Sequence, residues 1–158
     1  MRKIYLYKNN FALICLEEKG KKMKSIVVDD DKICGNIFKT ELSKFGQCDF
    51  VDNGKTALEA YQQSIEQGAP YQLMVLDIIM PDMDGGEVLR SIRRIESEKN
   101  IWEMDRLRVV ITTAYDDWYN RKIIISKLNC IYENYFIKSS DMNEFLDKVH
   151  ELGFVLED

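Results

Sequence analysis

The stretch that decides the fold is LMVLDIIMPDMDG, residues 73–85. Its first four residues are apolar, and a short apolar run bounded by turn residues is typical of a strand buried on both faces of a sheet. The run ends in Asp77, and Pro81 and Gly85 then indicate a turn. A second stretch, IVVDDD at residues 26–31, has the same form. The sequence therefore predicts two buried strands that each end in carboxylate.

Working outward, five apolar runs alternate with helical patterns from residue 24 to residue 152. We predict strands over residues 25–28, 48–51, 73–76, 108–112 and 135–137. We predict helices over residues 32–45, 55–67, 86–98, 116–129 and 141–152, with a loop over residues 100–107. This alternation implies an α/β fold with a parallel sheet and helices on both faces. In such a sheet the functional residues lie outside the carboxyl ends of the strands.

Polar side chains follow or end four of the five predicted strands and therefore meet at one edge of the sheet. They are Asp29, Asp30 and Asp31, then Asp77, then Thr112 and Thr113, and finally Lys138. Clustered carboxylates repel one another unless a cation offsets their charge, and oxygen ligands favour a hard ion such as Mg²⁺. Mg²⁺ and a lysine can neutralise phosphoryl oxygens, and a carboxylate can itself accept the phosphoryl group. The set indicates phosphoryl transfer to an aspartate.

From about residue 23 to residue 152 the chain resembles the receiver domain of bacterial response regulators, the CheY-like family. The resemblance rests on VVDDD (27–31), LDIIMPDMDG (76–85), ITTA (111–114) and YFIK (135–138). It implies a doubly wound (βα)5, flavodoxin-like three-layer sandwich whose five-stranded parallel sheet has the order 2-1-3-4-5. It also implies a signalling protein that is not an enzyme in the ordinary sense, since it catalyses only its own phosphoryl transfer and dephosphorylation.

The resemblance assigns the acidic residues to two tasks. Asp77 is the phosphorylated residue, and Asp29 and Asp30 hold Mg²⁺ together with Asp77 and the backbone carbonyl of Ile79. The register within the aspartate triplet is open by one residue, and we expect Asp31 to be a helix N-cap. The implied phosphoryl donor is a histidine kinase or a histidine phosphotransfer protein, and the only histidine of this chain, His150, is expected on the surface instead.

The same resemblance assigns the switch. Thr113 supplies the switch hydroxyl, Lys138 pairs with the phosphate, and Tyr135 is the aromatic switch, unless it is simply an aromatic residue at the edge of the core. Phosphorylation then reshapes the face formed by the fourth helix, the fifth strand and the fifth helix, which binds an unidentified downstream protein. We expect a stand-alone receiver, either a monomer or a phosphorylation-dependent dimer.

The chain departs from the family pattern beside the lysine and around the acceptor. Ser139 stands where family members have a proline in a cis bond, and we expect a trans bond because cis costs about 3 kcal/mol without proline. Ile79 and Tyr115 stand where family side chains flank the hydrolytic water. Neither side chain can orient that water well, so we predict a long-lived phosphorylated form.

Two alternatives compete with the receiver. A haloacid-dehalogenase-like phosphatase would use the Asp-x-Asp of residues 29–31 with Thr112 or Thr113, but its lysine should precede its last acidic pair, whereas Lys138 follows residues 116–117. A pseudo-receiver would bind its partner without phosphorylation. The complete set of acidic residues argues against it, although Ser139 keeps it open.

Composition limits the partners and the compartment. A net charge of −5 argues against nucleic acid, because phosphate binding needs a basic surface. The apolar run at residues 11–16 is too short to span a membrane and lacks a signal-peptide cleavage site. The four cysteines have no metal-binding spacing and are expected to be buried in a reducing cytoplasm.

We divide the chain into an N-terminal extension, residues 1–22, and a receiver domain, residues 23–158. The extension is expected to be a hairpin around residues 9–10 or a disordered segment. Within the receiver domain, Asp82 and Asp84 are expected to serve the turn before the third helix. Arg90, Arg93 and Arg94 on that helix are expected to lie on a solvated surface.

Overall fold

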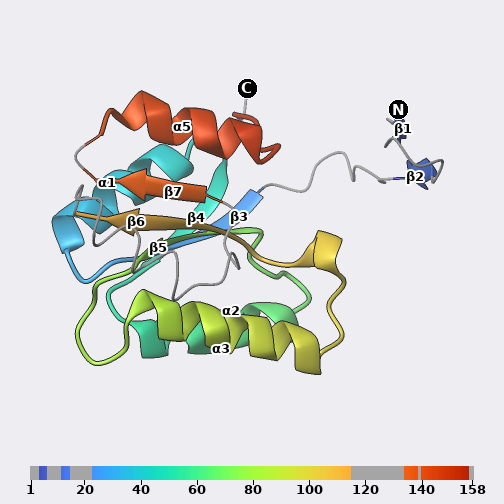
Figure 1. The fold of residues 1–158 in the computed structure, drawn as a ribbon, viewed down its shortest axis with the longest axis horizontal. Coiled ribbons are helices and arrows are strands. Elements are labelled where there is room, and N and C mark those ends of the chain that lie inside the picture. The colour runs from blue at the N-terminus through green and yellow to red at the C-terminus, as the bar shows by residue number, and fades with distance from the viewer. Residues whose placement is uncertain (1–3, 7–11, 15–22, 115–133, 139, 157–158) are drawn as a thin grey trace.

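The computed structural model describes residues 4–6, 12–14, 23–114, 134–138 and 140–156. At its centre is a parallel sheet (Figure 1), whose strands lie in the order β4 (Gly46–Val51), β3 (Met23–Val28), β5 (Leu73–Asp77), β6 (Arg108–Thr113) and β7 (Asn134–Ile137). Because β3 is the first strand of this sheet along the chain, the order is 2-1-3-4-5. The predicted fold class and strand order are confirmed.

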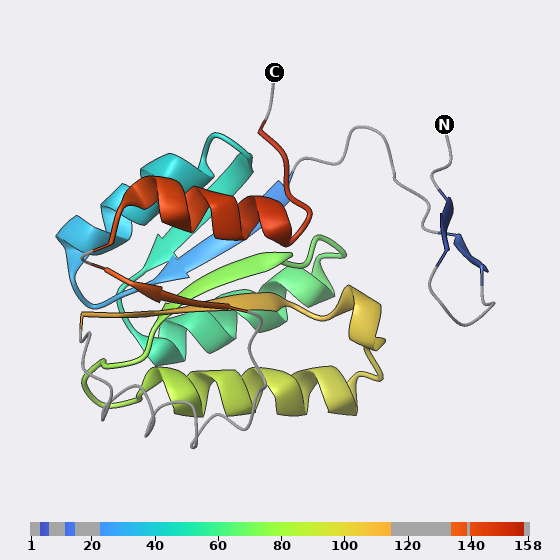
Figure 2. The same cartoon turned by 45° about the horizontal axis from the view of Figure 1, so that its top comes forward.

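Helices cover both faces of the sheet and make three layers (Figures 1 and 2). On one side lie α1 (Lys32–Leu42) and α5 (Met142–Glu151), and on the other lie α2 (Gly54–Glu66) and α3 (Gly85–Glu98). Alternate residues of each strand pack against opposite layers, as the pleat of a sheet requires. On β6, for example, Val110 joins the core under α1 and α5, whereas Val109 and Ile111 join the core over α2 and α3.

The predicted elements that fall within the described residues are present, and most of their bounds move by one or two residues. The helix predicted over residues 32–45 is wrong at its end, because α1 stops at Leu42. The next residues form tight turns in which Lys44 N–H donates to the Glu41 carbonyl at 3.2 Å and Phe45 N–H to that of Leu42 at 3.0 Å. The predicted loop over residues 100–107 contains a short 3₁₀ helix, η1 (Glu103–Asp105).

The prediction of a solvated surface on α3 is wrong for Arg93. Its side chain is 16% exposed and Nη1 lies 2.9 Å from Oε2 of Glu96, which is fully buried. Oε1 of Glu96 also accepts hydrogen bonds from the Tyr61 hydroxyl at 3.0 Å and from the Leu107 backbone N–H at 2.8 Å. Every oxygen of this buried carboxylate therefore has a donor, as a buried charge requires.

Some predictions fall outside the described residues. They concern the helix over residues 116–129, Tyr115, Ser139, and two of the cysteines, Cys15 and Cys130. Of the other cysteines, Cys48 is buried and Cys34 is half-buried. Among the helices that the structure describes, none has the length and apolar character needed to cross a bilayer.

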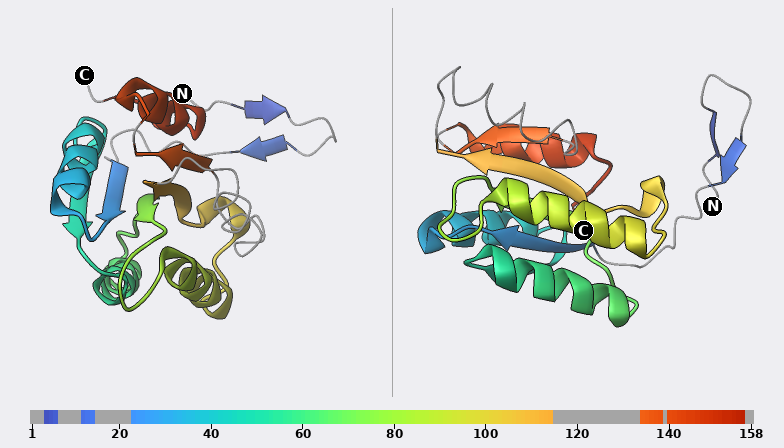
Figure 3. Two further views of the ribbon diagram at one scale, coloured as in Figure 1. Left: turned by 60° about the vertical axis from the view of Figure 1, so that its left-hand side comes forward. Right: turned by 60° about the horizontal axis from the view of Figure 1, so that its bottom comes forward.

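Within the N-terminal extension, β1 (Ile4–Leu6) and β2 (Ala12–Ile14) pair antiparallel, with Ile4 opposite Ile14. They form a two-stranded sheet of their own, separate from the parallel sheet (Figure 3). This pairing corresponds to the hairpin alternative for residues 1–22. The division of the chain at residue 22 stays a prediction.

Candidate functional site

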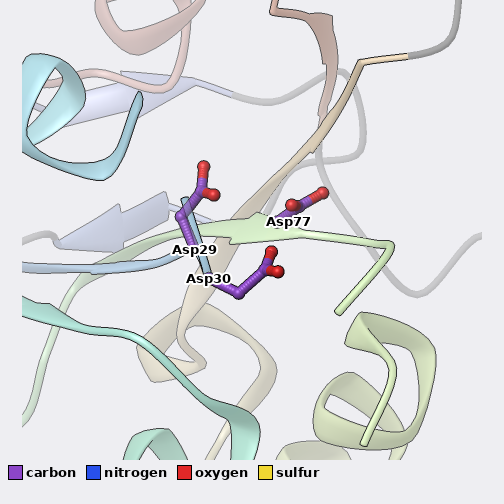
Figure 4. Close-up of side chains that lie close together, drawn as sticks. All are labelled: Asp29, Asp30 and Asp77. Atoms are coloured by element: carbon purple, nitrogen blue, oxygen red, sulfur yellow. The ribbon is translucent and has the colours of Figure 1, made fainter. Parts of the chain in front are cut away.

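Three carboxylates meet at the carboxyl edge of the sheet (Figure 4). Asp29 follows β3 and Asp77 ends β5, and both are buried, whereas Asp30 is exposed. Each offers an oxygen atom, and these atoms lie within 4.8 Å of one another. Because oxygens of this kind are the preferred ligands of Mg²⁺, the donor set fits that ion.

Lys138 supplies the positive charge between the two buried carboxylates. Its Nζ lies 2.8 Å from Oδ2 of Asp77, to which it donates a hydrogen bond, and 2.8 Å from Oδ2 of Asp29. The second contact is an ion pair without the angle of a hydrogen bond. Lys138 follows β7, so its side chain crosses β6 to reach β5 and β3. One ammonium thus connects three strands.

Burial and pairing act in opposite directions on the charges of this cluster. Removal from water raises the pKa of Asp29 and of Asp77 above the ordinary aspartate value, and the contacts with Lys138 only partly offset this effect. Burial alone would lower the pKa of Lys138, but its contacts with both carboxylates raise that pKa overall. Lys138 is therefore protonated, and the ionised forms of Asp29 and Asp77 are less stable than they would be in water.

The turn after β5 fixes Asp77 from the other side. The backbone N–H of Ile79 donates to Oδ1 of Asp77 at 3.2 Å, and Gly85 N–H donates to the Ile78 carbonyl at 3.0 Å. Gly85 lies so close to the Asp77 carbonyl that a Cβ atom there would collide with it. Asp84 then caps α3, in a reciprocal capping box with Glu87. Asp84 was predicted to serve the turn before the third helix, and in the structure it does so as the N-cap of α3.

The aspartate triplet divides into two structural roles. Asp31 caps α1, since its carboxylate accepts hydrogen bonds from the backbone N–H groups of Ile33 at 2.8 Å and Cys34 at 3.3 Å. Its own N–H donates to Oδ1 of Asp29 at 2.9 Å, which orients that carboxylate. The predicted N-cap is confirmed, and Asp29 and Asp30 are the members of the triplet that lie beside Asp77.

The predicted switch residues lie on β6, which is adjacent to the strand of Asp77, and on β7, the strand beyond it. Thr113 is buried at the end of β6, and Tyr135 on β7 is half-buried against the core over α2 and α3. Their switching roles stay predictions. His150 is exposed on α5, as expected, with Nδ1 2.9 Å from the Phe154 carbonyl oxygen.

Sequence reasoning placed Thr112 among the polar residues at the strand ends but gave it a specific role only in the phosphatase alternative. Thr112 is fully buried, and its register partner on β5 is Asp77. Within the described ranges, no group hydrogen-bonds its side-chain oxygen. The alternation of side chains along the strand could have placed Thr112 on the same face as Asp77 from the sequence alone. Only the structure shows that its hydroxyl has no hydrogen-bonding partner in the part of the chain that is described.

Comparisons with known proteins agree on one family. The family model described as the response regulator receiver domain matches residues 26–150. Two-component response regulator 24 of Arabidopsis thaliana is 26% identical over 137 residues, which cover 86% of this chain and 88% of that protein. Transcriptional regulatory protein QseB of Escherichia coli O157:H7 is 36% identical over 95 residues, which cover 60% of this chain but only 37% of that protein.

A solved structure gives the same result. The receiver domain of the histidine kinase CKI1 from Arabidopsis thaliana, complexed with Mg²⁺ and BeF₃⁻, is 25% identical. The match covers 83% of this chain and 89% of that chain, with a TM-score of 0.68. The CKI1 domain thus shares the fold and has been seen with the ion that the acidic cluster of this chain would fit.

Proposed function

The chain belongs to the response regulator receiver domain family, and we propose from this that Asp77 accepts a phosphoryl group in a two-component or phosphorelay system. The donor is a phosphohistidine on a histidine kinase or a phosphotransfer protein. A bond forms between an Asp77 carboxylate oxygen and phosphorus, and the phosphorus–nitrogen bond of the donor breaks. The observation that supports this most strongly is the ammonium of Lys138, 2.8 Å from the buried carboxylate of Asp77.

Each charged residue has a part in this transfer. Asp29, Asp30 and Asp77, with the Ile79 carbonyl, would hold Mg²⁺, which when bound supplies positive charge to the phosphoryl oxygens. Lys138 pairs with the Asp77 carboxylate before the transfer and with the charged phosphoryl oxygens after it. The Ile79 N–H keeps Oδ1 of Asp77 in place.

The phosphorylated site then changes a protein-binding surface. Thr113 hydrogen-bonds a phosphoryl oxygen, and Tyr135 on the neighbouring strand moves inward. The surface affected includes β7, α5 and the predicted helix over residues 116–129, which lies outside the described residues. The change is a shift between two populated states, and a downstream protein binds one of them.

The test is to treat the protein with acetyl phosphate, with and without Mg²⁺, and to measure intact mass. We expect one added phosphate that requires Mg²⁺ and is absent from Asp77→Asn. Borohydride reduces an aspartyl-phosphate to homoserine, so peptide mass spectrometry then locates the modified residue.

Each other outcome has a definite meaning. Modification of Asp29 instead of Asp77 would indicate the haloacid-dehalogenase-like phosphatase. A complete lack of modification in Mg²⁺ would contradict the proposed transfer. Partner binding that is unchanged in Asp77→Asn would then indicate the pseudo-receiver.

A further inference from the structure

We propose that Thr112 is a positioning residue of the phosphorylated site, whose hydroxyl donates a hydrogen bond to the Asp77 carbonyl oxygen that remains after phosphoryl transfer. The inference rests on the proposed function and adds a residue to it. Thr112 lies on β6, between β5, which carries Asp77, and β7, which leads to Lys138.

The hydroxyl of Thr112 is buried without a hydrogen-bonding group. The residue is fully inaccessible to solvent, and among the residues that the structure describes none pairs with Oγ1. The backbone carbonyl of Thr112 does accept a hydrogen bond, from Ile78 N–H at 3.0 Å, so only the side chain is unpaired. Buried polar side chains nearly always have a partner, and an exception needs a reason.

The sheet places the side chain of Thr112 beside that of Asp77. Thr112 and Asp77 are register partners on adjacent parallel strands. By the alternation of the pleat, Thr112 lies on the same face as Val110, and Asp77 on the same face as Val75, and both valines belong to the core under α1 and α5. Neighbouring strands are about 4.8 Å apart, so the two side chains lie side by side.

In the unphosphorylated site Thr112 donates to neither oxygen of the Asp77 carboxylate, and each of these oxygens already has another donor. Oδ2 of Asp77 accepts from Lys138 and Oδ1 accepts from the Ile79 N–H. After transfer, one of these oxygens bridges to phosphorus and the other is an uncharged carbonyl. Lys138 then moves to the charged phosphoryl oxygens, and Thr112, the register partner of Asp77 on the neighbouring strand, brings to the same face a donor without a partner among the described residues.

The experiment compares Thr112→Val, which keeps the shape and removes the hydroxyl, with Thr112→Ser, which keeps the hydroxyl. The probe is BeF₃⁻ in the presence of Mg²⁺, titrated by isothermal calorimetry. We expect Thr112→Val to bind BeF₃⁻ about fivefold more weakly, the value of one net hydrogen bond. We expect Thr112→Ser to bind it like the natural protein.

A second measurement does not need the loaded site. Without Mg²⁺, Thr112→Val should have a higher melting temperature than the natural protein, because an unpaired buried hydroxyl has been removed. The matched control is Val110→Thr, which buries a hydroxyl two residues earlier on the same face, away from Asp77. It should lower the melting temperature equally with and without Mg²⁺ and BeF₃⁻.

The results separate this inference from the proposed function. If the natural protein binds BeF₃⁻ and Thr112→Val binds it equally well, the role of Thr112 is overturned and the phosphoacceptor function stands. Equal weakening by Thr112→Ser and Thr112→Val also overturns it, since packing alone would explain the loss. If the natural protein does not bind BeF₃⁻ in Mg²⁺, the proposed function itself is overturned.

Discussion

Asp77 is the side chain on which the chemistry converges, and its surroundings before phosphorylation are unfavourable to its charge. It is 5% exposed, and burial raises its pKa despite the ion pair with Lys138. A neighbouring buried carboxylate, Asp29, adds repulsion. The site therefore stores unfavourable electrostatic energy that a cation or the loss of one charge can relieve.

This gives a prediction for stability against pH in the presence of EDTA. The folded pKa of Asp77 lies above its ordinary value of 3.8, so its contribution to stability is fully present below that value and is lost as the pH rises through the folded pKa. Asp77→Asn should remove this loss and raise the melting temperature near neutral pH by about 3 °C. Thermal unfolding from about pH 4 to pH 7 measures it.

The matched comparison is Asp30→Asn, which removes a carboxylate from the same cluster at its exposed position. It should raise the melting temperature near neutral pH by less than Asp77→Asn does, because an exposed charge is screened by water. An Asp77→Asn variant that is less stable than the natural protein near neutral pH would contradict the prediction.

The side chain of Ile79 leads to a separate prediction about the lifetime of the phosphorylated form. Its side chain is 51% exposed beside the acceptor and offers no polar group to the hydrolytic water. Ile79→Asn supplies such a group and should shorten the lifetime about tenfold, since orienting a reactant is worth at least that much. The decay is followed by intact mass after acetyl phosphate is removed. Loss of the phosphate from the natural protein within seconds would contradict the prediction.

The helices are positioned at the site by caps. α3 begins at Gly85, directly after the turn that holds Asp77, and its first turn is closed by Asp84 and Glu87. Oδ1 of Asp84 accepts from the Glu87 N–H at 2.8 Å, and Oε2 of Glu87 accepts from the Asp84 N–H at 3.1 Å. The same cap therefore fixes the helix and the end of the turn.

Loss of this cap should be measurable as a loss of stability. Asp84→Ala should lower the free energy of unfolding by about 1 kcal/mol, whereas Asp84→Asn keeps a good capping side chain and should cost only a few tenths of that. Urea unfolding of both variants gives the comparison. Equal losses in the two variants would show that the cap is not the cause.

The pattern of residues predicted the elements better than their ends. The apolar run at residues 25–28 marks the last four residues of β3, but the strand begins at Met23, which pairs with Gly46 of β4. Such pairing depends on the neighbouring strand and leaves no local signal. Likewise, the strand ends indicated the acidic site from the sequence alone. The burial of Arg93 was missed because its partner on the same helix, Glu96, is held by Tyr61 of α2 and by the Leu107 backbone, and α3 alone does not reveal those contacts.

The sheet as a whole is joined to the layer of α2 and α3 by the buried carboxylate of Glu96. It receives hydrogen bonds from Tyr61 on α2 and from the backbone before β6, and it pairs with Arg93. This cluster lies towards the amino end of β6, whereas Asp77 lies at the carboxyl edge. Stability and chemistry are thus supported at opposite ends of the sheet.

A substitution in this cluster should therefore change stability without changing the site. Glu96→Gln removes a charge that Arg93 needs and should lower the free energy of unfolding by about 3 kcal/mol. Glu98→Gln, on the same helix and exposed, is the control and should cost nothing measurable. Urea unfolding measures the loss, and labelling with acetyl phosphate should reach the same extent in the folded protein. Reduced labelling would show that the two ends are coupled.

The path of Lys138 across β6 has a consequence for synthesis of the chain. The lysine follows the last strand of the sheet, whereas its two partners follow the first strand and end the third, and Asp77 precedes it by 61 residues. A nascent chain emerges from the ribosome with its amino end first, so it has both carboxylates before it has the ammonium. Under the proposed function, a partly synthesised chain would lack the lysine that the transfer needs, so the first molecules to accept a phosphoryl group would be those completed through β7.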